Sequence, residues 1–301
     1  MSVPHDANPV PLIFGEVLYD VFPGGEEVLG GAAFNAAWNL QGLGLAPLFL
    51  SRVGRDERGE RVLEAMKAWG MNIDGVQVDP ERPTGIVDVT VQNGQPTYTI
   101  VADQAYDRID GEEAASWIDR ARPALLYHGT LALRSEVSRS AATALRHSRR
   151  APLFIDVNLR APWWSRDQVE TFLTGAAWAK LNDDEVTALS PQETGAGAAA
   201  AKLRERLGID HLVVTHGEHG ATHYVQDGRV LEVLASPVGC VADTVGAGDA
   251  FSAVLMLGQL RGWEPGETLA RAADYAASVC SRRGATSPDA SLYEPWRKRW
   301  Q

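Results

Sequence analysis

The sequence predicts an α/β fold with a mainly parallel central sheet, and three features of its 301 residues lead to that prediction. Apolar runs typical of strands alternate with segments that have apolar residues at helical spacing, which is the pattern of βαβ units. Runs such as 153–155 (LFI) and 212–214 (LVV) are continuously apolar, as in strands buried on both faces of a parallel sheet. Because no linker or repeat interrupts the chain, we expect one domain over residues 1–301.

The first third of the chain contains three strand patterns and two helix patterns. A first strand is predicted in PLIFGEVLYDVF, ending near Asp20. Apolar residues at helical spacing then predict a helix over 30–44 (GGAAFNAAWNLQGLG), and the pattern repeats as a strand at 46–54 and a helix at 56–70. A further strand is expected around 73–78.

Residues 84–101 (TGIVDVTVQNGQPTYTIV) break this rhythm, because two alternating runs flank Asn93-Gly94, a strong hairpin signal. An inserted hairpin is either an edge extension or a lid, and we predict a lid formed with part of 15–30. The alternation then resumes. Strands are expected at 124–131, 151–160, 178–185 and 211–217, helices at 168–176 and 196–208, a second hairpin at 220–235, and closing helices after 246 and over 266–284.

Charge and composition exclude several classes of function. The net charge of −11 and the pI of about 5.1 argue against a nucleic-acid binder or a binder of anionic membranes. The first residues lack a basic segment followed by an apolar one, and no apolar run is long enough for a membrane span, so we expect a cytoplasmic protein. The only cysteines, Cys240 and Cys280, are too far apart for a zinc motif and are expected to be buried free thiols.

The most informative stretch is DTVGAGDAFSAVLML, residues 243–257. Gly246 and Gly248 allow a tight turn that directs backbone N–H groups toward one point, and the apolar helix that follows directs its dipole at the same point. This pattern predicts a phosphate site. Asp249 is either a functional acid in that site or an ordinary acidic residue in a first helical turn, and spacing alone does not decide between them.

Neither common nucleotide motif accounts for this turn. The sequence has no GxxxxGK[ST], so a P-loop is excluded, and GGAAFNAAWNLQGLG does not match GxGxxG between a strand and a helix. An NAD-dependent oxidoreductase is therefore disfavoured.

Four segments together resemble the pfkB, or ribokinase-like, carbohydrate kinases. DTVGAGDAFSAVLML resembles the C-terminal signature of the family, and GGAAFNAAWNLQGLG with SRVGRDERGE resembles the N-terminal one. LNDDE is similar to the NxxE element and VTHGEHG to the TxGxxG strand end. The segments follow the family's order over almost the whole chain, which implies a three-layer α/β/α fold with a small β lid.

The resemblance implies a role for the acid in the turn. Asp249 would be the general base that accepts the proton of the attacking sugar hydroxyl, while the turn of Gly246, Ala247 and Gly248 stabilises charge on the phosphoryl group.

The resemblance also implies a site for ATP and Mg²⁺. Asn182 and Glu185 would hold a hydrated Mg²⁺, with Glu185 acting through water. The alternative is that Asn182 caps a helix whose first turn contains ordinary acidic residues. The nucleotide side would further include Thr215, Gly217, Gly220, Ala273 and Ala277. A histidine metal pair at His216 and His219 is disfavoured.

Sugar recognition is implied at the carboxyl ends of the strands, under the lid. Asp20, Gly31 and Asn35 match the family's sugar side, although alone Asp20 reads as a turn acid and Asn35 as a polar helix residue. DVNLRAPWW resembles a stretch of bacterial fructokinases and 2-keto-3-deoxygluconate kinases in which Arg160 would bind substrate or phosphate; a surface arginine is the alternative. Asp103, at the lid exit, is expected to influence which sugar fits.

A potassium site is implied next to the anion turn, at Asp243, Val245 and Gly284, where a glycine-capped helix end is an equally good explanation. Lid strands that pair between subunits would give a homodimer.

The resulting prediction is an ATP-dependent sugar kinase that acts on a small sugar, with fructose as the first choice. A 2-keto-3-deoxygluconate kinase, a ribokinase, a nucleoside kinase and a non-catalytic sugar or nucleotide sensor on the same fold are the alternatives.

Overall fold

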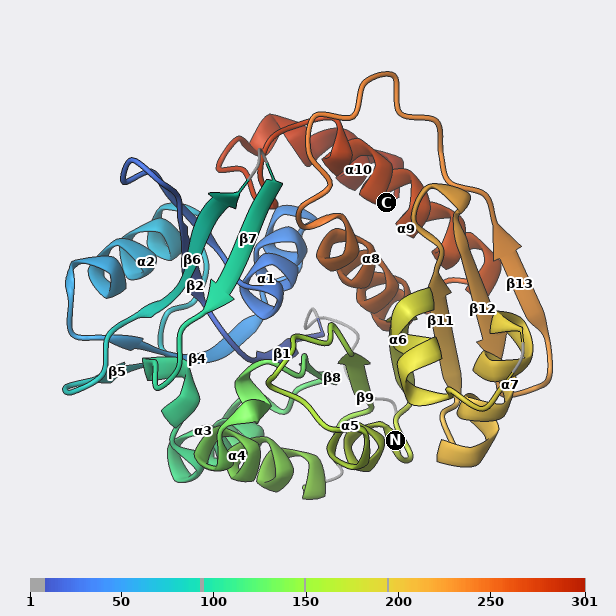
Figure 1. Cartoon of the computed structure of the whole chain (residues 1–301), viewed down its shortest axis with the longest axis horizontal. Coiled ribbons are helices and arrows are strands. Elements are labelled where there is room, and N and C mark those ends of the chain that lie inside the picture. Colours follow the sequence, from blue (N-terminus) through green and yellow to red (C-terminus); the bar gives the residue numbers. More distant parts are fainter. Residues whose placement is uncertain (1–8, 93–94, 149, 194, 301) are drawn as a thin grey trace, which may run out of the picture.

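The central sheet of the computed structural model contains nine strands among the described residues 9–92, 95–148, 150–193 and 195–300 (Figure 1). Their order is β13-β12-β11-β10-β9-β8-β1-β4-β5. All neighbours pair in parallel except β11 with β12 and β12 with β13. The prediction of an α/β fold with a mainly parallel central sheet is confirmed. The strands of this sheet are β1 (Pro11–Phe14), β4 (Leu48–Gly54), β5 (Val76–Asp79), β8 (Leu125–His128), β9 (Leu153–Asp156), β10 (Trp178–Asn182), β11 (His211–Thr215), β12 (Ala221–Val225) and β13 (Val230–Val233).

Helices cover both faces of this sheet. One face carries α1 (Ala32–Gly42), α2 (Glu57–Ala68), α8 (Ala247–Arg261), α9 (Pro265–Cys280) and α10 (Glu294–Arg299), and the other carries α3 (Gly111–Ala121), α4 (Glu136–His147), α5 (Arg166–Leu173), α6 (Asp183–Leu189) and α7 (Ala196–Leu207). Short 3₁₀ turns lie at Ala105–Arg108, Ala132–Arg134, Gly217–His219 and Ala290–Leu292.

Two hydrophobic cores result, one on each side of the sheet, because successive side chains of a strand point to opposite faces. In β9, Phe154 belongs to the core beneath α1 and α8, whereas Leu153 and Ile155 belong to the core beneath α4 and α5. The continuously apolar runs in the sequence have this cause.

A second, four-stranded sheet has the order β3-β2-β6-β7 and lies beside the first (Figure 1). It consists of β2 (Leu18–Val21), β3 (Glu27–Gly30), β6 (Gly85–Gln92) and β7 (Gln95–Ile100). It is built from the two segments from which the sequence predicts a lid, 84–101 and part of 15–30, and the Asn93-Gly94 turn of that prediction lies outside the described residues. Closure of this sheet over a substrate remains a prediction.

The structure corrects several details of the predicted elements. The single strand expected from Pro11 to about Asp20 is two strands in different sheets, because the chain turns at Gly15, where φ is +157° and an added Cβ would lie 2.5 Å from Ala33 Cβ. Helices α3 and α10 were not predicted. Both cysteines are free, but Cys240 is exposed and Cys280 is only partly buried, so the expectation of buried thiols is wrong.

Candidate active site

Several residues of the site lie at or just beyond the carboxyl ends of the parallel strands, at one edge of the central sheet. Glu16, which the sequence analysis did not single out, follows β1, Arg160 lies in the loop after β9, and Asn182 and Thr215 end β10 and β11. Asp20 lies in β2 of the second sheet. Carboxyl ends of parallel strands meet at one edge, which is where ligands bind in open α/β sheets.

The turn before α8 has the geometry that the glycine pattern predicts. Gly246 is the N-cap of α8 with φ at +79°, and an added Cβ would lie 2.1 Å from Ala285 Cβ. Ala247 and Gly248 begin the helix, and no side chain caps it. Ala247 N donates a long hydrogen bond of 3.3 Å to Thr244 O. The N–H groups of Gly248 and Asp249, next in this 15-residue helix, are available to an anion, and the helix dipole favours negative charge there.

Asp249 lies in the first turn of α8 and contacts α1. Its Oδ2 accepts a hydrogen bond of 2.8 Å from Asn35 Nδ2, so two residues 214 positions apart in the sequence meet here. Burial, and secondly the charge of Asp156, raise the pKa of Asp249 to about 6, against the opposing effects of Asn35, Lys180 and Arg160. A carboxylate with this pKa is mostly ionised at pH 7 and can accept a proton.

Helix α1, which holds Asn35, is capped by a residue that the sequence reading missed. Gly31 is its N-cap and has no side chain, but Glu16 Oε1 accepts a hydrogen bond of 3.0 Å from Ala32 N. A Cβ on Gly31 would lie 2.8 Å from the backbone oxygen of Glu16, so the glycine permits this approach. Burial raises the pKa of Glu16 to about 7, and Asp249 adds to the effect. The available signal was an acid beside Gly15 at the end of the first apolar run.

Asp20 and Arg160 are brought to the same region. Burial raises the pKa of Asp20 and the Arg160 charge lowers it, and Arg160 likewise lowers the pKa of Asp249. Tyr98 on β7 is 49% exposed, and after burial the charges of Asp20 and Asp243 raise its pKa. The second sheet therefore brings the Tyr98 phenol close enough to interact electrostatically with Asp20, on the sugar side, and with Asp243, which precedes the turn before α8.

Asp103 is not part of this cluster in the structure. Its mostly exposed carboxylate pairs with Arg82 Nε at 2.9 Å and with Arg108 Nη2 at 3.3 Å. A role in sugar choice would require these ion pairs to open, so the structure adds nothing in favour of that prediction.

Asn182 and Glu185 form a capping box at the start of α6. Asn182 Oδ1 accepts from Glu185 N at 2.8 Å, and Glu185 Oε2 accepts from Asn182 N at 2.9 Å. The other Glu185 oxygen accepts from Leu159 N, and burial raises the pKa of this carboxyl group. The structure therefore shows the helix cap that was the alternative explanation of this segment. Metal binding through water is still possible, because each Glu185 carboxylate oxygen retains a lone pair.

On the nucleotide side, Thr215 ends β11, Gly217 begins a 3₁₀ turn and Gly220 follows that turn. Ala273 and Ala277 lie one turn apart on α9, which packs against α8 (Figure 1). The His216 ring lies 2.8 Å from Asp183 Oδ1 through Nδ1 and 2.9 Å from Thr222 Oγ1 through Nε2, so both of its nitrogens have hydrogen-bond partners.

The three residues predicted to bind potassium are brought together by hydrogen bonds. Asp243 Oδ1 accepts from Val245 N at 3.0 Å and Oδ2 accepts from Gly284 N at 3.1 Å. These contacts fix the loop before the anion turn against the segment after α9.

Three further polar residues lie beneath the turn and were not predicted. Lys180 Nζ donates to Asp156 Oδ1 at 2.7 Å, and Ser252 Oγ donates to Asp156 Oδ2 at 2.6 Å. The available signals were a lysine inside the apolar run of β10 and an aspartate that ends LFID; their pairing depends on strand register, which the sequence does not reveal.

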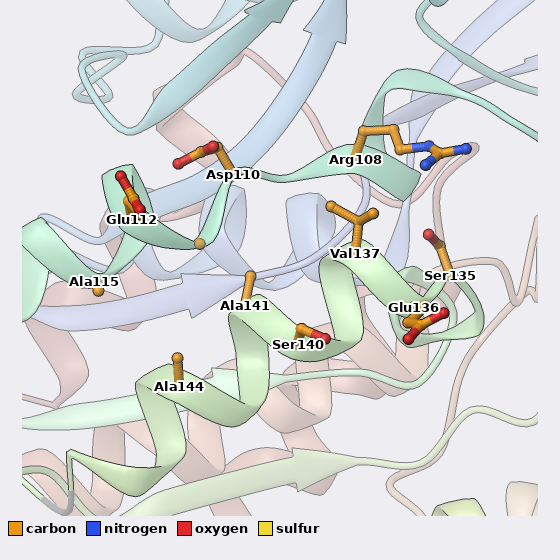
Figure 2. Close-up of a pocket in the computed structure, with 11 residues that line it drawn as sticks. Arg108, Asp110, Glu112, Ala115, Ser135, Glu136, Val137, Ser140, Ala141 and Ala144 are labelled. Atoms are coloured by element: carbon orange, nitrogen blue, oxygen red, sulfur yellow. The ribbon is translucent and has the colours of Figure 1, made fainter.

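A surface hollow between α3 and α4 contains none of the predicted residues (Figure 2). Its walls include Glu112 and Ala115 from α3 and Ser140, Ala141 and Ala144 from α4. Within the described ranges, no group of three or more histidine, cysteine or acidic residues is placed to hold a metal. Among those same residues, no helix has the length and apolarity needed to cross a membrane.

An acid beside a helix N-terminus, at the edge of a three-layer α/β/α fold, is the arrangement expected of an enzyme that transfers a phosphoryl group to a hydroxyl. The model of the pfkB family carbohydrate kinases matches residues 14–291, and the chain belongs to this family. It is an ATP-dependent sugar kinase.

Known proteins resemble the chain over nearly its whole length. A fructokinase from Klebsiella pneumoniae is 29% identical over 305 residues, covering 95% of this chain and 96% of that protein. The crystal structure of a Xylella fastidiosa fructokinase with bound ATP superposes with a TM-score of 0.85 at 21% identity, covering 97% and 99% of the two chains. A double mutant of a Vibrio cholerae O395 fructokinase, solved with fructose, ADP and potassium ion, has a TM-score of 0.81 at 21% identity, covering 96% and 98%. These likenesses confirm the three-layer fold.

Proposed function

We propose that the chain transfers the γ-phosphoryl group of ATP to a hydroxyl of fructose, with Asp249 as general base. The observation that carries the proposal is the 2.8 Å contact between Asn35 and Asp249. It joins the N-terminal motif expected to bind sugar to the C-terminal motif expected to bind phosphate. Fructose is preferred because relatives such as the Klebsiella pneumoniae protein are named fructokinases.

In the proposed reaction, a primary hydroxyl of the sugar loses its proton to Asp249. The hydroxyl oxygen forms a bond to the γ-phosphorus while the bond from that phosphorus to the bridging oxygen breaks, and ADP leaves. A pKa of about 6 keeps Asp249 ionised at pH 7 and still basic enough to take the proton.

The turn of Gly246, Ala247 and Gly248 would stabilise the phosphoryl group during transfer. The first N–H groups of α8 face it, and they cost no reorganisation because the helix already holds them in place. Asp20 and Arg160 would orient the sugar, and the two alanines of α9 would leave room for the base of the nucleotide.

The chain has residues that fit the metal ions expected with ATP. With both oxygens fixed by backbone N–H groups, Glu185 would act on a hydrated Mg²⁺ through water, as a hydrated ion prefers. When bound with ATP, Mg²⁺ would neutralise charge on the phosphates. Asp243, Val245 and Gly284 would bind K⁺, and their mutual hydrogen bonds support that assignment.

We further propose that the four-stranded sheet closes over the sugar and excludes water, which would suppress ATP hydrolysis. The charges of Asp20 and Asp243 acting on Tyr98 support this position of the lid. Strand β7 is an edge strand, so its pairing with a second copy would give a homodimer, and a cytoplasmic location fits the acidic composition.

A substrate screen tests the proposal. Purified protein is given ATP and Mg²⁺ with fructose, ribose, 2-keto-3-deoxygluconate or a nucleoside, with and without K⁺, and ADP is measured by a coupled assay. The highest kcat/KM is expected with fructose, together with a rise on adding K⁺. Turnover of ribose as efficient as that of fructose would contradict the assignment of the sugar, while leaving the kinase activity intact.

A further inference from the structure

A buried ion pair lies directly behind the anion turn. Asp156 ends β9, and Lys180 is its register partner on the neighbouring strand β10. Their side chains are 2% and 9% exposed, and Ser252 on α8 occupies the second Asp156 oxygen. Burying two charges has a desolvation cost that the ion pair alone rarely recovers, so a role beyond stability is indicated.

The ammonium group of Lys180 lies next to the turn itself. A Cβ built on Gly248 would lie 3.5 Å from Lys180 Nζ. The ammonium group is therefore close to the backbone of the turn, and no side chain at Gly248 lies between them. An ammonium group has three N–H donors, and Asp156 accepts from one of them. Among the described residues, no second protein group accepts a hydrogen bond from Lys180 Nζ.

We propose that Lys180 is a catalytic residue that donates a hydrogen bond to the transferring phosphoryl group, and that Asp156, held by Ser252, positions it. This inference rests on the proposed kinase function of the same site. Lys180 would supply a positive charge close to Asp249, whose negative charge would otherwise repel phosphate, in a chain whose net charge is −11. Because the Asp156 carboxylate fixes the ammonium, little reorganisation accompanies transfer, unlike at the exposed Arg160.

The ion pair also acts on the proposed base, with opposite signs from its two members. Asp156 raises the pKa of Asp249 and Lys180 lowers it. Asn35 donates a hydrogen bond to Asp249, and the other titratable groups that interact electrostatically with it are Glu16, Tyr127, Asp156, Arg160 and Lys180.

The test compares Lys180→Met with wild type, and uses Lys202→Met on the exposed face of α7 as a matched control. Calorimetry measures the affinity for AMP and for a non-hydrolysable ATP analogue, and the coupled assay measures kcat. We expect Lys180→Met to weaken binding of the analogue about tenfold or more, because a charge-assisted hydrogen bond is lost, with AMP affinity unchanged. The kcat should fall by about 10²-fold to 10³-fold, as when one transition-state donor is removed.

The pH profile separates this role from a structural one. Lys180→Met should move the acid limb of kcat/KM to higher pH, whereas Asp156→Asn should move it to lower pH. Lys180→Met with normal kcat, normal affinity for the analogue and an unmoved acid limb would overturn the proposal, even if its stability fell.

A second variant decides the question if Lys180→Met does not fold. Ser252→Ala leaves Lys180 in place and removes the hydrogen bond that holds the second Asp156 oxygen. Lower analogue affinity and lower kcat with normal AMP affinity in Ser252→Ala support the proposal, and wild-type values of all three refute the positioning of Lys180 by Asp156. Failure of the proposed function has a different signature, because wild-type protein would then form no ADP with any sugar.

Discussion

Replacing Gly246 by alanine should damage both stability and turnover. A non-glycine residue at φ +79° costs about 1–2 kcal/mol. The new Cβ would also lie 2.1 Å from Ala285 Cβ and 2.5 Å from Ala285 Cα, and relieving such an overlap costs about 1–3 kcal/mol. The free energy of unfolding should therefore fall by about 2–5 kcal/mol, and the displaced turn should carry Asp249 away from Asn35.

Gly248→Ala provides the control, because its nearest neighbour would be a flexible lysine end at 3.5 Å and its φ is ordinary. Alanine at this helical position should leave the free energy of unfolding unchanged or raise it by up to about 1 kcal/mol. Urea denaturation of wild type and both variants, combined with kcat measurements, separates the two glycines. Gly246→Ala with wild-type stability and wild-type kcat would refute the geometry assigned to this turn.

Three further predictions concern the groups around Asp249. The kcat/KM should fall with decreasing pH through about 6, because protonation removes the base, and a flat profile from pH 5 to 8 would contradict this. Asn35→Ala removes a hydrogen bond that favours the charged form of Asp249, so the acid limb of the kcat/KM profile should move to higher pH and kcat/KM should fall about tenfold. Measuring kcat/KM against pH checks both effects, and an acid limb at the wild-type pH would count against the contact. Because the pKa of Glu16 is raised from 4.5 to about 7, the stability that its protonated form contributes is present below pH 4.5 and is lost as pH rises through 7. At pH 8, Glu16→Gln should therefore be about 1–3 kcal/mol more stable than wild type. Equal urea midpoints of the two proteins at pH 8 would show that Glu16 is ionised without cost.

The layered fold could be predicted because its signals are local. Continuous apolar runs such as those of β9 and β11 indicate strands buried on both faces, and the glycine pattern before α8 predicts its positive φ at Gly246. The break at Gly15 was missed, because apolar residues continue beyond Glu16 and the close approach of Ala33, which leaves no room for a side chain at position 15, is not visible in the sequence. Helix α3 (Gly111–Ala121) lies in a stretch to which the sequence analysis assigned no element.

The site could be predicted only where one motif carries a whole function. The turn before α8 was predicted from adjacent residues, whereas the role of Asp249 as a base was implied only by the family resemblance. The Asn35 contact joins residues 214 positions apart, and the Lys180–Asp156 pair depends on the register of two strands; neither leaves a local signal. Glu16 was missed because it caps α1 from 16 residues before Ala32 in the sequence, whereas the N-cap residue itself, Gly31, has no side chain.

The most direct test of the central claim compares Asp249→Asn with wild type in sugar-dependent ADP formation, with binding of fructose and an ATP analogue measured on the same samples. The account predicts that kcat falls by at least about 10²-fold while both ligands still bind, because asparagine keeps the size of the side chain and removes the base. Turnover by Asp249→Asn within a few-fold of wild type would contradict it.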